Sequence, residues 1–170
     1  MAALRLFIGI AIPAEIRSQI SEVVRELKSA NANVRWEQID KLHITMKFLG
    51  DTPDHQVPSI VTALESLATK VPAFRVTYSG VGCFPNKREP RIIWVGVDEG
   101  NSVLVPLAES IDALMTTFGF EKEDKRFHPH VTIGRVKNQH NMRDLLRTME
   151  SITFVSHPTT ISELALVKSE

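Results

Sequence analysis

The sequence predicts a two-lobed α+β fold, and three observations carry this prediction. Strand-like and helix-like segments are mixed along the 170 residues without the strict alternation that is typical of a parallel α/β sheet. A strand–helix–strand–helix order recurs loosely in each half of the chain. Each half also contains one strand with the pattern histidine, apolar residue, threonine, apolar residue, at 43–46 and at 130–133.

The individual elements follow from hydrophobic periodicity and from Pro and Gly positions. Apolar residues at helical spacing predict helices at 13–29, 54–69, 100–118 and 142–149. Runs rich in β-branched residues predict strands at 4–12, 41–50, 73–81, 92–97, 130–136, 152–155 and 161–167. Between them lie a connection at 30–40, a Pro-rich basic loop at 83–91 and a charged segment at 119–126. No stretch reads as a linker, so we expect residues 1–170 to form a single domain with two lobes.

Charge and cysteine content limit the classes of function. Lys and Arg total 20, as do Asp and Glu, so bulk positive charge does not drive binding to nucleic acid, although a local basic patch is compatible with this balance. The one cysteine, Cys83, excludes an intrachain disulfide and a CxxC metal cluster, and we read it as a small buried residue. We therefore expect a cytoplasmic protein. No apolar run reaches the length of a membrane span, so no membrane partner is expected.

Alternation along the first motif strand separates two faces. Side chains at i and i+2 of a strand share a face, which places His43, Thr45 and Lys47 together. The opposite face, which suits packing against a helix, then holds Ile44, Met46 and Phe48. In the second motif strand, His130 and Thr132 share a face. We expect the two histidine–threonine faces to form the two walls of one site.

Two histidines on opposite walls suit acid–base chemistry at phosphorus. Imidazole titrates near neutral pH, so one ring can accept a proton while another, already charged, donates one. The hydroxyls of Thr45 and Thr132 would donate hydrogen bonds to the phosphoryl oxygens. This chemistry requires no metal, cofactor or covalent nucleophile. Two other interpretations stay open: the strands are simply amphipathic and face solvent, or His128 and His130 hold a metal ion.

A family resemblance sharpens this interpretation. The paired motifs resemble the two HxTx motifs of the 2H phosphoesterase superfamily, and the whole chain resembles the LigT-type RNA 2′,3′-cyclic phosphodiesterases, also called 2′-5′ RNA ligases. The similar segments, in order, are 5–10 with Pro13, Arg35-Trp36, 42–50, 82–85, 90–94 and 129–135. Each segment alone is modest, but the ordered set is specific.

The resemblance implies both a fold and an activity. The fold is the bilobal 2H-phosphoesterase (LigT-like) fold, with two pseudo-symmetric lobes whose antiparallel sheets surround a central cleft and whose helices lie outside. The activity is metal-independent hydrolysis of an RNA-terminal 2′,3′-cyclic phosphate to a 2′-phosphate, and the reverse reaction would join a 5′-hydroxyl to that end. His43 would be the proton donor and His130 the proton acceptor. The expected partner is RNA, or a nucleotide with a cyclic phosphate end, bound by a monomer.

Several further residues are candidates for substrate contact. Arg135 matches the arginine that follows the second motif in similar proteins and would hold phosphate, but strict alternation turns it away from His130 unless a bulge intervenes. Phe84 could stack on a base. The basic residues of the 83–91 loop could steer an RNA backbone, although a solvated loop is the commoner explanation for such a run: Lys87, Arg88 and Arg91. We expect Phe48 and Trp94 to be core residues.

Two other functions remain open at this point. The same fold could serve as a non-catalytic nucleotide-binding or RNA-binding module, because a fold does not determine a function. A phosphodiesterase acting on a small nucleotide or an oligoadenylate would use the same histidine–threonine faces.

Overall fold

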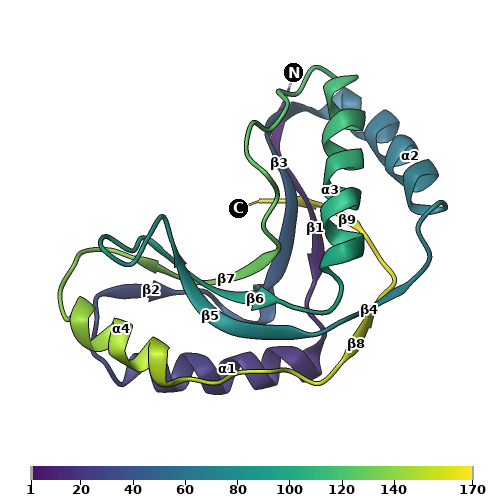
Figure 1. The fold of residues 1–170 in the computed structure, drawn as a ribbon. Coiled ribbons are helices and arrows are strands. Elements are labelled where there is room, and N and C mark those ends of the chain that lie inside the picture. Colours follow the sequence, from purple (N-terminus) through teal and green to yellow (C-terminus); the bar gives the residue numbers. More distant parts are fainter. Residues whose placement is uncertain (1, 170) are drawn as a thin grey trace.

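Within residues 2–169, which the computed structural model describes, the chain forms a bent antiparallel sheet of seven strands (Figure 1). These strands are β1 (Ala3–Ala11), β2 (Val34–Trp36), β3 (His43–Pro53), β5 (Tyr78–Phe84), β6 (Ile92–Val97), β7 (His130–Val136) and β9 (Ala165–Lys168). A separate pair joins β4 (Phe74–Val76) to β8 (Thr159–Ile161). The predicted α+β class with antiparallel pairing is confirmed.

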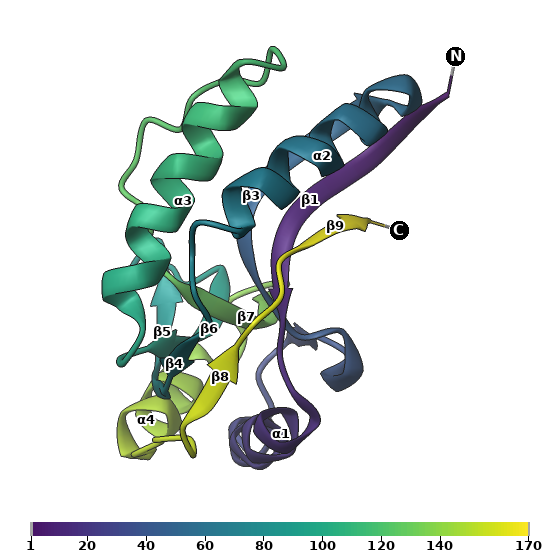
Figure 2. The same cartoon turned by 90° about the vertical axis from the view of Figure 1, so that its right-hand side faces the viewer.

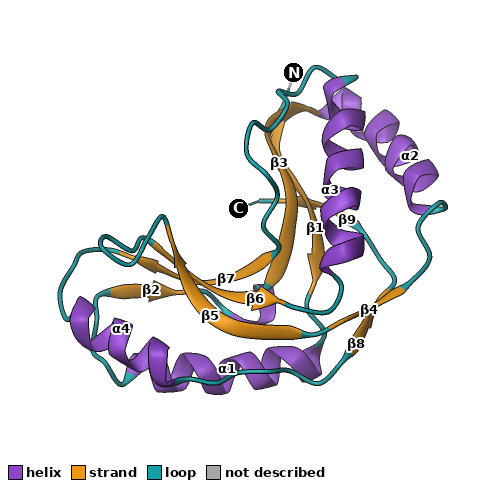
Figure 3. Cartoon of the chain, viewed as in Figure 1, coloured by secondary structure: helices purple, strands orange, loops and turns teal. Residues whose placement is uncertain are grey.

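The sheet bends where the two halves of the chain meet. Its order is β5-β6-β7-β3-β1-β9, and β2 pairs with the far end of β7. The strands β3 and β7 share one pair of opposite residues, Ile44 and Val131, and diverge from there. Figure 3 shows the result as two arms: β1, β3 and β9 form the upper arm, and β2, β5, β6 and β7 form the lower arm.

Four helices of the described residues cover the convex side of the bend. They are α1 (Ala14–Lys28), α2 (Val57–Ala68), α3 (Asn101–Thr116) and α4 (Met142–Ser151), with short 3₁₀ turns at Ile39–Lys41 and Asp54–Gln56. The helices α1 and α4 pack together below the lower arm, and α2 packs with α3 against the upper arm (Figures 1 and 2). The helix α1 follows an upper-arm strand but packs below the lower arm. The helix α3 follows a lower-arm strand but packs against the upper arm. The first helix of each half therefore covers the other arm.

The core lies between the helices and the convex face of the sheet. The predicted inward residues of α1 are all buried: Ile16, Ile20, Val23, Val24 and Leu27. The residues flanking the histidines on that face, Ile44 and Val131, are fully buried. Burial of this apolar surface, worth about 25 cal/mol per Å², holds the two motif strands against the helices. No helix among residues 2–169 is long and apolar enough to cross a membrane.

Four predicted segments differ from the structure. The connection at 30–40 contains β2, which exists because β7 offers it a partner edge. The strand predicted at 73–81 is split at Thr77, where the chain passes from the small sheet to the large one. The segment 152–155 makes only an isolated bridge from Val155 to Ser79, and the strand predicted at 161–167 divides between β8 and β9.

Candidate active site

The junction of the two arms brings both motifs together. Ile44 lies directly opposite Val131 in the antiparallel pair of β3 and β7. Continuing this register by one residue in each direction sets His43 opposite Thr132 and Thr45 opposite His130. Opposite residues of a pair share a face, so these four side chains project to the concave side of the bend, away from the buried Ile44 and Val131.

Both imidazoles are held by the same local contact. The Nδ1 atom of His43 lies 2.8 Å from the carbonyl oxygen of Lys41, and Nδ1 of His130 lies 2.6 Å from the carbonyl oxygen of His128. A carbonyl oxygen only accepts, so Nδ1 carries the proton in each ring and donates it two residues back. This leaves Nε2 as the reactive atom of each histidine. In His43, Nε2 lies 3.0 Å from the Thr45 hydroxyl oxygen.

The electrostatic environment favours a neutral His130. Burial lowers the pKa of the His130 imidazole, the charge of His128 lowers it further, and the hydrogen bond to the His128 carbonyl opposes this in part. A neutral ring with the proton on Nδ1 presents an unprotonated Nε2 to the concave side. His130 is therefore suited to accept a proton near neutral pH.

A bulge in β3 changes the face of the residues that follow the first motif. Gly9 pairs with Thr45 and Ile8 pairs with Lys47, so Met46 is an extra residue in β3. Both expectations from strict alternation are consequently wrong. Lys47 is buried on the convex side, with 4% of its surface exposed, whereas Phe48 is 52% exposed and not a core residue.

A matching bulge follows the second motif. Trp94 pairs with Thr132 and Ile93 pairs with Gly134, so Ile133 is the extra residue in β7. Beyond it, Gly134 is buried and Arg135 is exposed, which returns Arg135 to the face of Thr132. The bulge that a phosphate-binding Arg135 would need is therefore present. In this structure the Nε atom of Arg135 lies 3.0 Å from the Glu37 carboxylate.

Aromatic rings flank each histidine. On the upper arm, Phe7 stacks on His43 with ring centroids 4.5 Å apart, and Phe48 lies 5.9 Å beyond Phe7. On the lower arm, the Phe84 ring lies edge-on to His130 at 5.0 Å and beside Trp94 at 5.2 Å. Trp94 is half-buried on the concave face, so the expectation of a core tryptophan is wrong; glycines make room for its ring.

Two of the three cations of the basic loop at 83–91 lie beside carboxylates. Lys87 lies 3.6 Å from Glu150, and Arg91 lies 3.0 Å from Glu89. Among residues 2–169, the exposed Arg88 is held only through its backbone N–H, which donates to the Asn86 side chain. The loop joins β5 to β6 and so borders the Phe84 end of the site.

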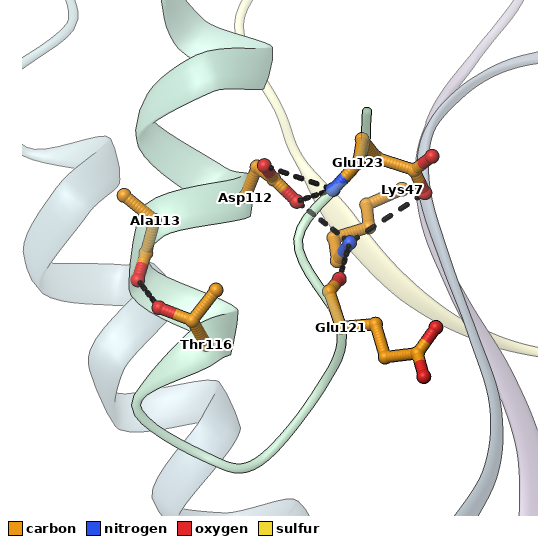
Figure 4. Close-up of polar contacts among 6 residues, drawn as sticks. All are labelled: Lys47, Asp112, Ala113, Thr116, Glu121 and Glu123. Atoms are coloured by element: carbon orange, nitrogen blue, oxygen red, sulfur yellow. Dashed lines mark hydrogen bonds and ion pairs between the residues drawn. The ribbon is translucent and has the colours of Figure 1, made fainter. Parts of the chain in front are cut away.

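The buried Lys47 fixes the segment that leads into the second motif. Its ammonium donates to the Asp112 carboxylate at 2.7 Å and to the Glu121 carbonyl at 2.9 Å, and it lies 3.6 Å from the Glu123 carboxylate (Figure 4). The Glu123 N–H donates to the same Asp112 carboxylate at 3.1 Å. This group of contacts ties β3, α3 and the 117–129 segment together, and its last member, Glu123, lies five residues before His128.

No group of three or more His, Cys, Asp or Glu side chains within residues 2–169 is arranged to hold a metal ion. The His128 and His130 rings, which the sequence left open as metal ligands, lie 6.0 Å apart, and Nδ1 of His130 is engaged by the His128 carbonyl.

The fold and the site define a two-lobed α+β protein with one His-x-Thr strand contributed by each half. Comparison with known proteins then gives its family. The chain belongs to the LigT-like phosphoesterase family, whose model matches residues 10–94 and 95–170. This division falls between β6 residues Trp94 and Val95, so each matched part contains one motif.

Curated relatives share one name. The chain is 30% identical to the RNA 2′,3′-cyclic phosphodiesterase of Aquifex aeolicus, with 99% of this chain and 90% of that protein covered. It is 33% identical to the protein of the same name from Archaeoglobus fulgidus, with 89% and 84% covered.

Solved structures match over almost the whole chain. E. coli LigT in complex with 3′-AMP aligns with a TM-score of 0.72 at 25% identity, covering 99% of this chain and 89% of that one. The protein TT0787 of Thermus thermophilus aligns with a TM-score of 0.81 at 24% identity, covering 98% and 89%, which supports the fold.

Sequence reasoning missed the role of Phe7 at this site and placed Phe48 and Trp94 wrongly. One signal was available: small residues lie beside each ring. A Cβ on Gly9 would come within 3.0 Å of the Phe7 ring, and a Cβ on Gly82 within 2.4 Å of the Trp94 ring. Glycines in a predicted strand indicate the close approach of another group, here a ring lying flat on the sheet.

Proposed function

We propose that the chain hydrolyses 2′,3′-cyclic phosphate ends of RNA to 2′-phosphates, with His43 as the proton donor and His130 as the proton acceptor. The observation that carries the proposal is the matched anchoring of both rings by Nδ1 on one face of the bend. Family membership and the shared name of the relatives support the substrate class.

The proposed reaction is a single in-line displacement. His130 Nε2 takes a proton from water, and the resulting hydroxide attacks phosphorus. The bond from phosphorus to the 3′-oxygen breaks, and His43 Nε2 gives its proton to that oxygen, which leaves a 2′-phosphate and a 3′-hydroxyl. Solvent then returns the two imidazoles to their starting protonation. A 5′-hydroxyl that takes the place of water in this displacement would use the same two groups to form a 2′-5′ linkage.

Three side chains are proposed to hold the phosphoryl oxygens. Thr45, whose hydroxyl oxygen lies 3.0 Å from His43 Nε2, would donate its hydroxyl proton to a phosphoryl oxygen, while the Nε2–H of His43 serves the leaving 3′-oxygen. Thr132 would supply the equivalent donor from β7. Arg135 lies on the same face, and its guanidinium can leave the half-exposed Glu37 contact for a phosphate.

The lower arm offers the base contact. Phe84, supported by Trp94, presents a ring beside His130 on which the terminal base would stack. Arg88 is the loop cation best placed to reach RNA, because Lys87 and Arg91 already face carboxylates. We also propose that residues 1–170 act as one monomeric domain in the cytoplasm.

The decisive assay uses RNA with a 2′,3′-cyclic phosphate end, incubated in EDTA. The expected product is a 2′-phosphate, and His43→Ala and His130→Ala should each lower kcat by about 10²–10⁴. Arg143→Ala, on the outer face of α4, is the matched control and should keep full activity. Calorimetry with a nucleotide monophosphate decides the alternative: binding without turnover would indicate a non-catalytic binding module.

A further inference from the structure

A row of side chains crosses the lower arm just beyond the proposed site. Phe84 of β5 pairs with Ile92 of β6, Ile92 pairs with Arg135 of β7, and Arg135 pairs with Arg35 of β2. Directly opposite residues of an antiparallel pair project to one face. Arg35 therefore shares the concave face with Arg135, and with Thr132 further along β7.

Packing on the other face supports this orientation. A Cβ on Gly134 would come within 2.8 Å of the Val34 side chain and 2.9 Å of the Trp36 side chain. Val34 and Trp36 thus lie on the convex face, where they pack against the core. Arg35, between them in β2, is exposed and projects the opposite way.

The charges of this row are unbalanced. Two arginines directly opposite each other repel. Glu37, two residues along from Arg35, pairs with Arg135 at 3.0 Å. Arg35 has no ion pair or side-chain hydrogen bond to any residue in the part of the chain that the structure describes. With two positive groups and one negative group, the row keeps one positive charge for an anion.

The distance to the histidines suggests which anion binds. Thr132 pairs with Trp94 and Arg135 pairs with Ile92, so the bulge leaves Arg135 and its neighbour Arg35 two residues of β6 beyond Thr132, roughly 7 Å at about 3.3 Å per residue. That length is comparable to one nucleotide step. The phosphodiester on the 5′ side of the terminal nucleotide is the next anion along the substrate, and guanidinium matches its paired oxygens.

We propose that Arg35 binds the phosphodiester on the 5′ side of the terminal cyclic nucleotide and makes the enzyme prefer an RNA chain to a mononucleotide. This inference rests on the proposed function. Arg35 then determines substrate length, whereas His43 and His130 act at the end of the chain.

The test compares three substrates in EDTA: a nucleoside 2′,3′-cyclic phosphate, the same nucleotide with a 5′-phosphate, and a dinucleotide ending in a 2′,3′-cyclic phosphate. The wild-type protein should turn over the second and third with higher kcat/KM. In Arg35→Ala this gain should fall roughly tenfold, mainly through KM, while kcat/KM for the first substrate changes less than about twofold. Arg35→Lys, which keeps the charge without the planar guanidinium, should lose less.

Controls separate the possible failures. Arg143→Ala should keep the higher kcat/KM on the substrates with a 5′-phosphate. Thermal melting should show that Arg35→Ala is folded. If Arg35→Ala is unfolded, Arg35→Gln, which has a longer side chain, takes its place in the test. Wild-type protein that turns over none of the three substrates would overturn the proposed function itself. Activity on the first substrate without a gain from the 5′-phosphate, or an equal loss on all three in Arg35→Ala, would overturn the role of Arg35 alone.

Discussion

Replacing Lys47 by methionine should destabilise the protein strongly, because the bulge at Met46 commits this ammonium to the buried side. The Lys47 side chain is 2% exposed, and its partner Asp112 is 12% exposed. Methionine fills a similar volume but leaves the Asp112 carboxylate with only the Glu123 N–H as partner. Breaking a buried ion pair on one side costs about 3–5 kcal/mol. At about 2–4 °C per kcal/mol for a chain of this size, the melting temperature should fall by about 6–20 °C.

Two further measurements test the same reasoning. The double variant Lys47→Met with Asp112→Leu removes both charges and should recover most of the lost stability. In wild type, burial raises the pKa of Asp112, but the Lys47 hydrogen bond, the Glu123 N–H and the charges of Lys47 and Lys122 outweigh it, so the net pKa lies below 3.8. The stability that the ionised Asp112 carboxylate contributes to the folded protein is present above pH 3.8 and is lost as the pH falls below that value. Without Lys47 the pKa rises, so the deficit of Lys47→Met should shrink between pH 7 and pH 4. A loss under about 1 kcal/mol, independent of pH, would refute the argument.

Three more predictions concern stability around the site. Phe48→Ala should change the free energy of unfolding by less than about 0.5 kcal/mol in urea titrations, as for an exposed residue, whereas a core phenylalanine would cost about 3–5 kcal/mol. Gly82→Ala should cost about 1–3 kcal/mol and shift tryptophan fluorescence, since its Cβ would strike the Trp94 ring; unchanged emission with unchanged stability would contradict the packing. Because the folded pKa of His130 is below 6.5, the unfolded chain binds its proton first, so wild-type stability should fall as pH drops below 6.5, and His130→Gln should flatten this slope.

Much of the fold was predictable because its strongest signals are local. The helix faces follow from apolar spacing, and α1 buries the five residues that this spacing selects. The two motifs were recognisable because His43 and Thr45, and His130 and Thr132, precede any irregularity in their strands. The short strands were not predictable in the same way: β2 spans three residues and depends on the edge of β7, which is distant in sequence.

The candidate site was predicted up to the fourth residue of each motif and no further. Alternation is a rule for regular strands, and each bulge reverses it for the residues up to the next irregularity. That reversal moves Phe48 and Arg135, each five residues after a motif histidine, onto the face of the histidines. A bulge is defined by the register between two paired strands, so the sequence of one strand does not reveal it. The same limit hid Arg35, whose position has meaning only opposite Arg135.

The pH dependence of kcat/KM on an RNA end with a 2′,3′-cyclic phosphate, measured in EDTA, tests the central claim most directly. Two imidazoles that act as base and acid should give a bell-shaped profile for wild type. Its acid limb should lie below pH 6.5, where the lowered pKa of His130 places the loss of the neutral base. In His130→Ala the rate should drop by about 10²–10⁴ and the acid limb should vanish. A wild-type profile that is flat through neutrality, or His130→Ala with wild-type rates, would contradict the claim that the two histidines act together at one phosphate.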